Sequence, residues 1–117
     1  MAFQIHTHEE EGKLVVSLSG SLDTVFAEDL KTALNQVLST GNHHIVLSLK
    51  GVKYVASSAI RVFLLFGKAV QQHQGALRMA EVPANILAVF SMVGLGTSLP
   101  IFDSLSDALG SFDDHGR

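Results

Sequence analysis

Residues 44–62, HIVLSLKGVKYVASSAIRV, change character at a pair of serines. Residues 44–49 are mostly apolar and β-branched, which is typical of a strand buried on both faces of a sheet. The Lys-Gly pair that follows indicates a turn, and the apolar run after Ser57 and Ser58 has the length of a helix. We therefore predict a central strand, then a turn, then a helix that begins at the serines.

The helix predicted after the serines is apolar around most of its circumference. Only Arg61, Lys68 and Gln72 form a narrow polar stripe, so other parts of the protein must cover most of this helix. Large apolar side chains that stay uncovered would form a contact surface for a partner. The candidates for such exposure are Leu64, Leu65 and Phe66 in this helix and Met92 further along the chain.

Upstream of the central strand, the sequence predicts a hairpin and a helix. Residues 3–8 alternate apolar and polar side chains, a glutamate-rich turn follows, and residues 13–19 resume as a second strand. A Gly-Ser-Leu-Asp segment interrupts that strand, and either its Asp23 or the next residue, Thr24, can cap a helix with apolar residues at the 3.6-residue period.

Downstream, the sequence predicts a strand at 76–80, a helix that starts at Pro83, an edge strand at 100–102, and a last helix at 105–109 capped by Ser104. Strands that alternate with helices require a mostly parallel sheet with helical crossovers. The predicted fold class is α/β, a mixed and mostly parallel sheet of about five strands with an opening antiparallel hairpin and about four helices.

Length and composition limit the possible functions. The chain has 117 residues, so we assign residues 1–110 to a single domain and residues 111–117 to a polar, flexible tail. Its 8 Lys and Arg and 11 Asp and Glu residues give a net charge of −3, and the basic residues form no cluster. The sequence therefore lacks the positive patch that is typical of nucleic-acid-binding proteins. There is no cysteine, and no secretory signal is visible. The apolar run at 62–66 is far shorter than the about 20 residues of a membrane span, so we expect a cytoplasmic protein without membrane insertion.

Two kinds of chemical site are considered and set aside. A hydrolase nucleophile elbow needs Gly two residues away on both sides of its serine, and neither Ser57 nor Ser58 has it. His6 and His8 share one face of a strand, and the histidines at 43–44 could approach them, but no carboxylate spacing completes a metal set. We predict no cofactor and no metal.

Two roles remain open for the serines. One hydroxyl can cap the helix, which contributes about 1 kcal/mol. The same position is also open to a kinase, because a helix N-terminus at the end of a buried strand lies at the surface and its free amides can hold a phosphate. A phosphate would add about −1.5 to −2 charge without melting the helix, so its effect would fall on whatever docks there.

Three segments, in the same order along the chain, carry a family resemblance. Gly20-Ser21-Leu22-Asp23 is similar to a Gly-x-Leu-Asp loop, and Ala56-Ser57-Ser58-Ala59-Ile60 within residues 44–62 is similar to the signature Asp-Ser-Ser-Gly-Leu. The third segment, up to about Leu109, is similar to a closing helix, strand and helix. With these segments the chain resembles the STAS domain, the family of bacterial anti-sigma factor antagonists.

The resemblance implies a protein without enzymatic activity that binds an anti-sigma factor serine kinase and thereby releases the sigma factor. It implies that phosphorylation at Ser57, with Ser58 as the second choice, abolishes this binding, and that a serine phosphatase restores it. It also implies that the loop after the second strand shares the contact surface with the signature. The partner-binding residues expected on this basis are Ser21, Asp23, Thr24, Ala56, Ser57, Ser58, Ala59 and Arg61.

Two positions depart from the signature. Ala56 stands where Asp is usual, which removes a carboxylate beside the serine, and Ala59 stands where Gly is usual, which favours a regular helix. An alternative function is therefore a STAS scaffold that does not switch, either a subunit of a lipid-transport ATPase complex or part of a signalling assembly. A third class, binding of a small ligand or nucleotide, rests on the glycines near 94–96. The oligomeric state stays open between a monomer and a weak dimer.

Overall fold

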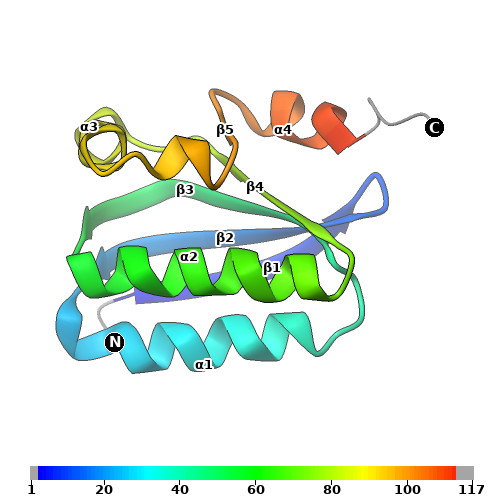
Figure 1. The fold of residues 1–117 in the computed structure, drawn as a ribbon, viewed down its shortest axis with the longest axis horizontal. Helices are drawn as coiled ribbons and strands as arrows, with labels where there is room; N and C mark the ends of the chain where they lie inside the picture. Colours follow the sequence, from blue (N-terminus) through cyan, green and yellow to red (C-terminus); the bar gives the residue numbers. More distant parts are fainter. Residues whose placement is uncertain (1–2, 113–117) are drawn as a thin grey trace.

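A five-stranded sheet forms the centre of the protein, in a computed structural model that describes residues 3–112 (Figure 1). The elements, in chain order, are β1 (Phe3–Glu10), β2 (Lys13–Leu22), η1 (Thr24–Phe26), α1 (Ala27–Leu38), β3 (His44–Val55), α2 (Ser57–Gln72), β4 (Ala76–Ala80), α3 (Ala84–Met92), η2 (Leu95–Thr97), β5 (Ile101–Phe102) and α4 (Leu105–Ser111).

The strands lie in the order β1-β2-β3-β4-β5. β1 and β2 are antiparallel, joined by a two-residue turn in which Glu11 and Gly12 both have positive φ, 55° and 81°. All later pairs are parallel, because each is connected through a crossover helix. The predicted fold class, a mixed and mostly parallel sheet with an opening hairpin, is confirmed.

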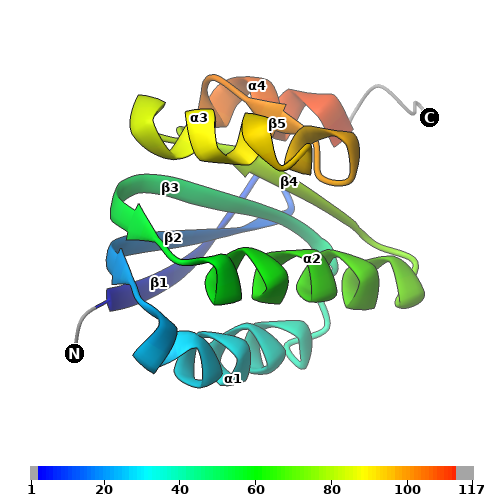
Figure 2. The same cartoon turned by 60° about the vertical axis from the view of Figure 1, so that its left-hand side comes forward.

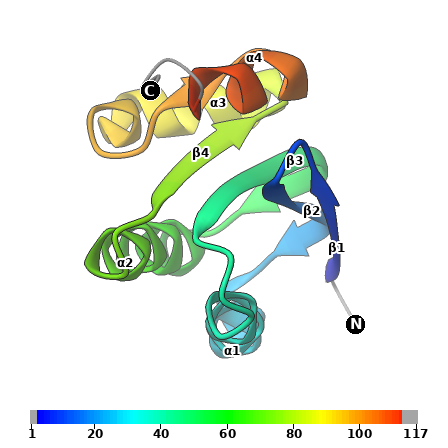
Figure 3. The same ribbon diagram turned by 90° about the vertical axis from the view of Figure 1, so that its right-hand side faces the viewer.

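The two faces of the sheet are covered by different helices. The larger core contains buried residues of α1, α2 and α3, whereas the smaller core on the other face is closed by Ala108 and Leu109 of α4. Alternation along β2 explains this division, since Leu14 and Val16 belong to the larger core and Val15 between them belongs to the smaller one. Figure 3 shows α1 and α2 together on one side of the sheet and α4 on the other.

The predicted turn at residues 50–51 is wrong, because β3 continues without interruption to Val55. The register between β2 and β3 shifts once between Ser17 and Ser19 and again just before Ser21, each time leaving one extra residue on β3. These irregularities have the character of β-bulges, which put two exposed residues side by side within a strand. The strand stays in phase with the core because its inward residues step by two and then by three: Ile45, Leu47, Leu49, Val52 and Val55.

The end of β2 also differs from the prediction. Gly20, Ser21 and Leu22 do not interrupt the strand but extend it, and Leu22 is buried in the larger core. The predicted cap by Asp23 or Thr24 is wrong, since η1 intervenes and α1 begins only at Ala27 without a side-chain cap. A short 3-10 turn at the start of a helix is a common alternative to a capped start.

The C-terminal helix is anchored to the sheet. Its predicted cap is confirmed, because Ser104 Oγ accepts a hydrogen bond of 3.0 Å from the amide of Asp107. Ser111 and Phe112, which we placed in the tail, belong to the folded part: Arg78 Nε donates to Ser111 Oγ at 2.9 Å, and the guanidinium lies 4.6 Å from the Phe112 ring centroid. Burial in this contact lowers the pKa of Arg78. The rest of the predicted tail, residues 113–117, lies outside the described residues.

Candidate functional site

The carboxyl ends of β2, β3 and β4 lie at one edge of the sheet, because these strands are parallel neighbours. At this edge Leu22 pairs with Val55, and the amide of Ala56 donates a 2.9 Å hydrogen bond to the carbonyl oxygen of Leu22. The chain that leaves β2 and the chain that leaves β3 therefore start from adjacent points. Figure 2 shows both departures on the left of the molecule, where β2 leads to η1 and β3 leads to α2.

The helix α2 starts without a side-chain cap. Ala56 is the N-cap residue, with φ −78° and ψ 161°, and its carbonyl oxygen accepts from the amides of Ala59 and Ile60 at 3.0 and 3.1 Å. The prediction that a hydroxyl of Ser57 or Ser58 caps this helix is wrong, because both serines already lie inside the first turn. The usual signature carboxylate would therefore stand at the N-cap position, where Asp is among the preferred residues.

The two serines differ in accessibility. Ser57 is exposed, whereas Ser58 is half-buried and its Oγ is buried without a hydrogen-bond partner among residues 3–112. A modifying enzyme must reach the hydroxyl oxygen, so the geometry favours Ser57 as the modified residue. The buried hydroxyl of Ser58 has the cost that an unsatisfied polar group carries, of the order of 1–3 kcal/mol.

The segment after β2 lies beside this helix start. Its η1 turn contacts α2 and is closed by a 3.0 Å hydrogen bond from the amide of Phe26 to the carbonyl oxygen of Asp23. Ser21 and Asp23 are half-buried and Thr24 is exposed. Ser21 also pairs with Tyr54 in the sheet, one step before the Leu22 pair. The structure thus brings both predicted segments together, and we call Ser21, Asp23, Thr24 and Ser57 the Ser57 edge.

Outside the Ser57 edge lie three more of the predicted contact residues: Arg61, Ala56 and Ala59. Arg61 is exposed and lies one turn into α2 from Ser57. Ala56 is only 4% exposed and Ala59 is fully buried in the larger core, so neither offers its side chain to a partner.

Two exposed apolar residues near the Ser57 edge were missed by sequence reasoning. Val25 in η1 is 82% exposed, and Tyr54 at the end of β3 is 53% exposed. Val25 lies within an ordinary amphipathic pattern, and Tyr54 follows a bulge, so no local pattern marks either as exposed. Exposed apolar side chains beside a modifiable serine are suited to a protein contact.

The histidines of the described residues do not gather into one cluster. Among residues 3–112, no group of three potential ligands could hold a metal ion. His8 Nε2 lies 3.1 Å from Glu10 Oε1, while the ring centroid of His43 lies 4.8 Å from that of His73. His8 and His43 therefore belong to different contacts. Within the same range, none of the helices has the length and apolar character needed to cross a membrane.

Comparison with known proteins gives consistent matches over nearly the whole chain. The family model described as STAS domain matches residues 4–108. A putative anti-sigma factor antagonist, BtrV, of Bordetella bronchiseptica is 30% identical over 87% of this chain and 88% of its own length. The anti-sigma F factor antagonist of Paenibacillus polymyxa is 31% identical over 93% and 94%. The crystal structure of an anti-sigma factor antagonist from Mycobacterium paratuberculosis has the same fold, with a TM-score of 0.84 at 22% identity and coverage of 93% and 92%.

Proposed function

The chain belongs to the STAS domain family, and from this we propose that it is an anti-sigma factor antagonist controlled by phosphorylation of Ser57. Unphosphorylated, it binds an anti-sigma factor serine kinase at the Ser57 edge, and the sigma factor is released. The kinase phosphorylates Ser57 and ends the complex, and a serine phosphatase reverses the modification. The role is binding, not catalysis, it needs no cofactor, and it belongs to the cytoplasm.

The observation that carries this proposal is the position of Ser57. It is the exposed first residue of α2, beside the exposed Thr24 and Val25 of the neighbouring segment. The names of the two relatives at 30% and 31% identity support the same role. Of the two serines in the signature, only Ser57 presents an accessible hydroxyl.

A phosphate at Ser57 would act on the interface and leave the fold intact. The N-terminus of a helix tolerates an anion, because its free amides and its dipole favour negative charge. A partner that buries the same position would have to desolvate a dianion, and any acidic group facing it would be repelled. A loss of about 4 kcal/mol in binding free energy corresponds to a weakening of about 1,000-fold.

The first experiment is phosphorylation in vitro. Each anti-sigma factor serine kinase of the source organism is purified and incubated with the protein and ATP, and intact mass is measured. We expect one added phosphate, absent in Ser57→Ala and retained in Ser58→Ala. Binding of the same kinase, measured by calorimetry, should persist in Ser57→Ala and be lost in Ser57→Asp.

Ser58→Ala is the matched control, because it removes the other hydroxyl of the signature and leaves Ser57 in place. A kinase that modifies a control antagonist but adds no phosphate to this chain would overturn the switch. Equal binding by Ser57→Ala and Ser57→Asp would also argue against the Ser57 edge as the contact.

A second candidate, the STAS scaffold without a switch, is favoured by one observation. Met92 at the end of α3 is 85% exposed, and Val89 and Val93 near it are also exposed, so this helix presents an apolar surface although it contains neither serine of the signature. Such a scaffold, in a lipid-transport ATPase complex or a signalling assembly, would co-purify with its partner regardless of Ser57. Co-purification that survives Ser57→Asp but is lost in Met92→Glu would support this second function.

A further inference from the structure

The outward face of α2 differs in charge from the rest of the protein. The helix contains no Asp or Glu, although the chain as a whole carries a net charge of −3. Its exposed charged side chains are Arg61 and Lys68, spaced two turns apart. Neither forms an ion pair or a side-chain hydrogen bond within residues 3–112. Two cations are therefore available to a partner along a helix that has no acidic side chain of its own.

Between the two cations lie two exposed leucines. Of the three candidates in this helix, Leu64 is 39% exposed and Leu65 is 49% exposed, whereas Phe66 is only 4% exposed and belongs to the core. At i, i+4 and i+8, Ser57, Arg61 and Leu65 follow one line along the helix. We call the residues Ser57, Arg61, Leu64, Leu65 and Lys68 the α2 ridge.

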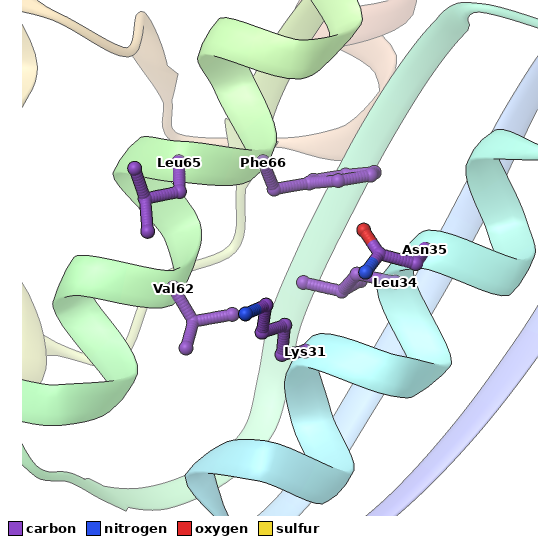
Figure 4. A pocket seen from close by; sticks show the side chains of 6 residues that line it. All are labelled: Lys31, Leu34, Asn35, Val62, Leu65 and Phe66. Carbon is purple, nitrogen blue, oxygen red and sulfur yellow. The ribbon is translucent and has the colours of Figure 1, made fainter.

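Each side of the ridge borders a depression. On the α1 side, a pocket of about 50 Å³ is lined by Leu34, Val62 and Leu65, and Figure 4 shows Lys31 reaching from α1 towards Val62. This volume is far below the about 300 Å³ at the lower end for ligand sites, so the pocket fits part of a partner's side chain and no free ligand. On the other side, Leu64 and Lys68 line an open groove with Ser98 near η2. Lys31, also exposed and without an ion pair among the described residues, adds a third cation next to the ridge.

We propose that the α2 ridge is the main docking surface for the anti-sigma factor, and that it pairs with an amphipathic helix of that partner whose exposed face combines Asp or Glu with apolar side chains. This inference rests on the proposed function and adds the chemistry of the partner. Charge complementarity selects this occupant, because unpaired cations on both sides of exposed leucines match a helix of alternating acidic and apolar residues. The ridge is continuous with the Ser57 edge, since Ser57 is its first residue.

The same geometry gives a mechanism for the switch. A phosphate on Ser57 would lie four residues before Arg61. At this spacing, an anion on the N-terminal side of a cation is the favourable orientation for an ion pair along a helix. A phosphate on Ser57 attracts the Arg61 guanidinium and so removes the cation that the partner's carboxylate needs. Phosphorylation thus turns the head of the ridge from cationic to anionic, and the acidic partner is repelled.

Charge reversal tests the docking surface. Arg61→Glu and Lys68→Glu should each weaken binding of the unphosphorylated protein to the anti-sigma factor kinase by at least about tenfold at low salt, and the affinity of the wild type should fall as salt is raised. The matched control is Lys50→Glu, because Lys50 is also exposed but lies on the α4 side of the sheet, in a hollow beside Leu105. The control should bind as the wild type does.

The results separate the two proposals. Wild-type affinity in Lys68→Glu, together with loss of binding in Ser57→Asp, would overturn the α2 ridge while leaving the proposed function in place. No binding of the wild type to any anti-sigma factor kinase would overturn the proposed function. Equal loss in Lys50→Glu and Lys68→Glu would point to overall charge and would also overturn the ridge.

The mechanism of the switch can be tested without a partner. Phosphoserine is installed at position 57 by genetic code expansion, and its phosphorus resonance is titrated by NMR. An ion pair with Arg61 holds the second pKa of the phosphate below its ordinary value near 6, so Arg61→Gln should raise it, whereas Lys68→Gln should leave it unchanged. Identical titrations of all three proteins would overturn the role of Arg61.

Discussion

Replacement of Ala56 by a capping residue should stabilise the protein. The backbone at Ala56 already has the extended φ and ψ that an N-cap residue requires, −78° and 161°, so a new side chain needs no rearrangement of the chain. An Asn, Ser or Asp side chain can accept a hydrogen bond from a first-turn amide, and such a cap contributes about 1 kcal/mol compared with Ala. Asp adds about 0.3–1 kcal/mol through the helix dipole.

The buried surroundings of Ala56 set the order of the variants. Because the residue is only 4% exposed, a larger side chain must find room, and a carboxylate also loses hydration. We expect Ser, the smallest cap, to give about 1 kcal/mol in full, and Asn and Asp to give this amount less the cost of fitting the side chain. A gain of 1 kcal/mol corresponds to a rise in Tm of about 3–6 °C for a chain of this size.

The assay is urea unfolding followed by circular dichroism, with thermal unfolding as a second measurement. A change in midpoint with an unchanged m-value would identify a change in stability alone. The control is Ala56→Val, which adds volume without an acceptor and should destabilise. If Ser, Asn and Asp at this position all leave the midpoint at or below that of the wild type, the helix start is satisfied in some other way and our account of the N-cap is wrong.

Three further predictions concern stability and are measured by the same unfolding assays. Phe63→Ala should lower the free energy of unfolding by about 3–5 kcal/mol, because Phe63 is fully buried and its ring packs edge-on against that of Phe90, with 6.5 Å between the ring centroids. A loss below about 1 kcal/mol would contradict its place in the core. Gln74→Gly should raise stability by about 0.5–1 kcal/mol, since the exposed Gln74 has a φ of 62° that glycine adopts without strain, and an unchanged midpoint would speak against such strain. Gly75→Ala should cost at least about 1–3 kcal/mol, because a Cβ atom there would collide with the carbonyl oxygen of His43, and a neutral result would mean that the backbone can move apart.

The sequence was sufficient to predict which elements form and in what order. Alternation in β1 and the 3.6-residue period in α1 each have one geometric interpretation, and the apolar run of α2 has the length of a helix, so these elements are predictable from the residues alone. Ser104 was also recognised correctly as a cap, since a polar residue directly before an isolated apolar helix has few other roles.

The errors arose where a local pattern depends on a neighbour in space. Lys50 and Gly51 resemble a turn because a polar residue followed by glycine is typical of turns, yet they lie in a bulge that exists only through the pairing of β3 with β2. The caps failed for a related reason: a serine can cap a helix only from the residue before its first turn, and a shift of one position puts Ser57 inside the helix.

The candidate site was predictable only in part. The residues alone indicate that Ser57 lies at an accessible helix start and that Arg61 belongs to a polar stripe. The contact role of both residues and the closeness of Thr24 came from the family resemblance, because no local pattern reveals that Leu22 pairs with Val55. Nor could the sequence distinguish the accessible Ser57 from the buried Oγ of Ser58, since burial of adjacent residues depends on how the helix is rotated on the sheet.

The two extra residues of β3 determine where the strand tolerates a deletion. Loss of Lys50 or Gly51 would change an inward step of three into the ordinary step of two, so that Val52 and Val55 would still face the core and the pair of Leu22 with Val55 would be kept. The start of α2 and the direction of Ser57 would then be unchanged. Loss of one residue from the regular part of the strand, between Ile45 and Leu49, would instead exchange inward and outward positions on one side of the deletion. We therefore expect a strand one residue shorter to be accepted at the bulges and rejected in the regular part of the strand.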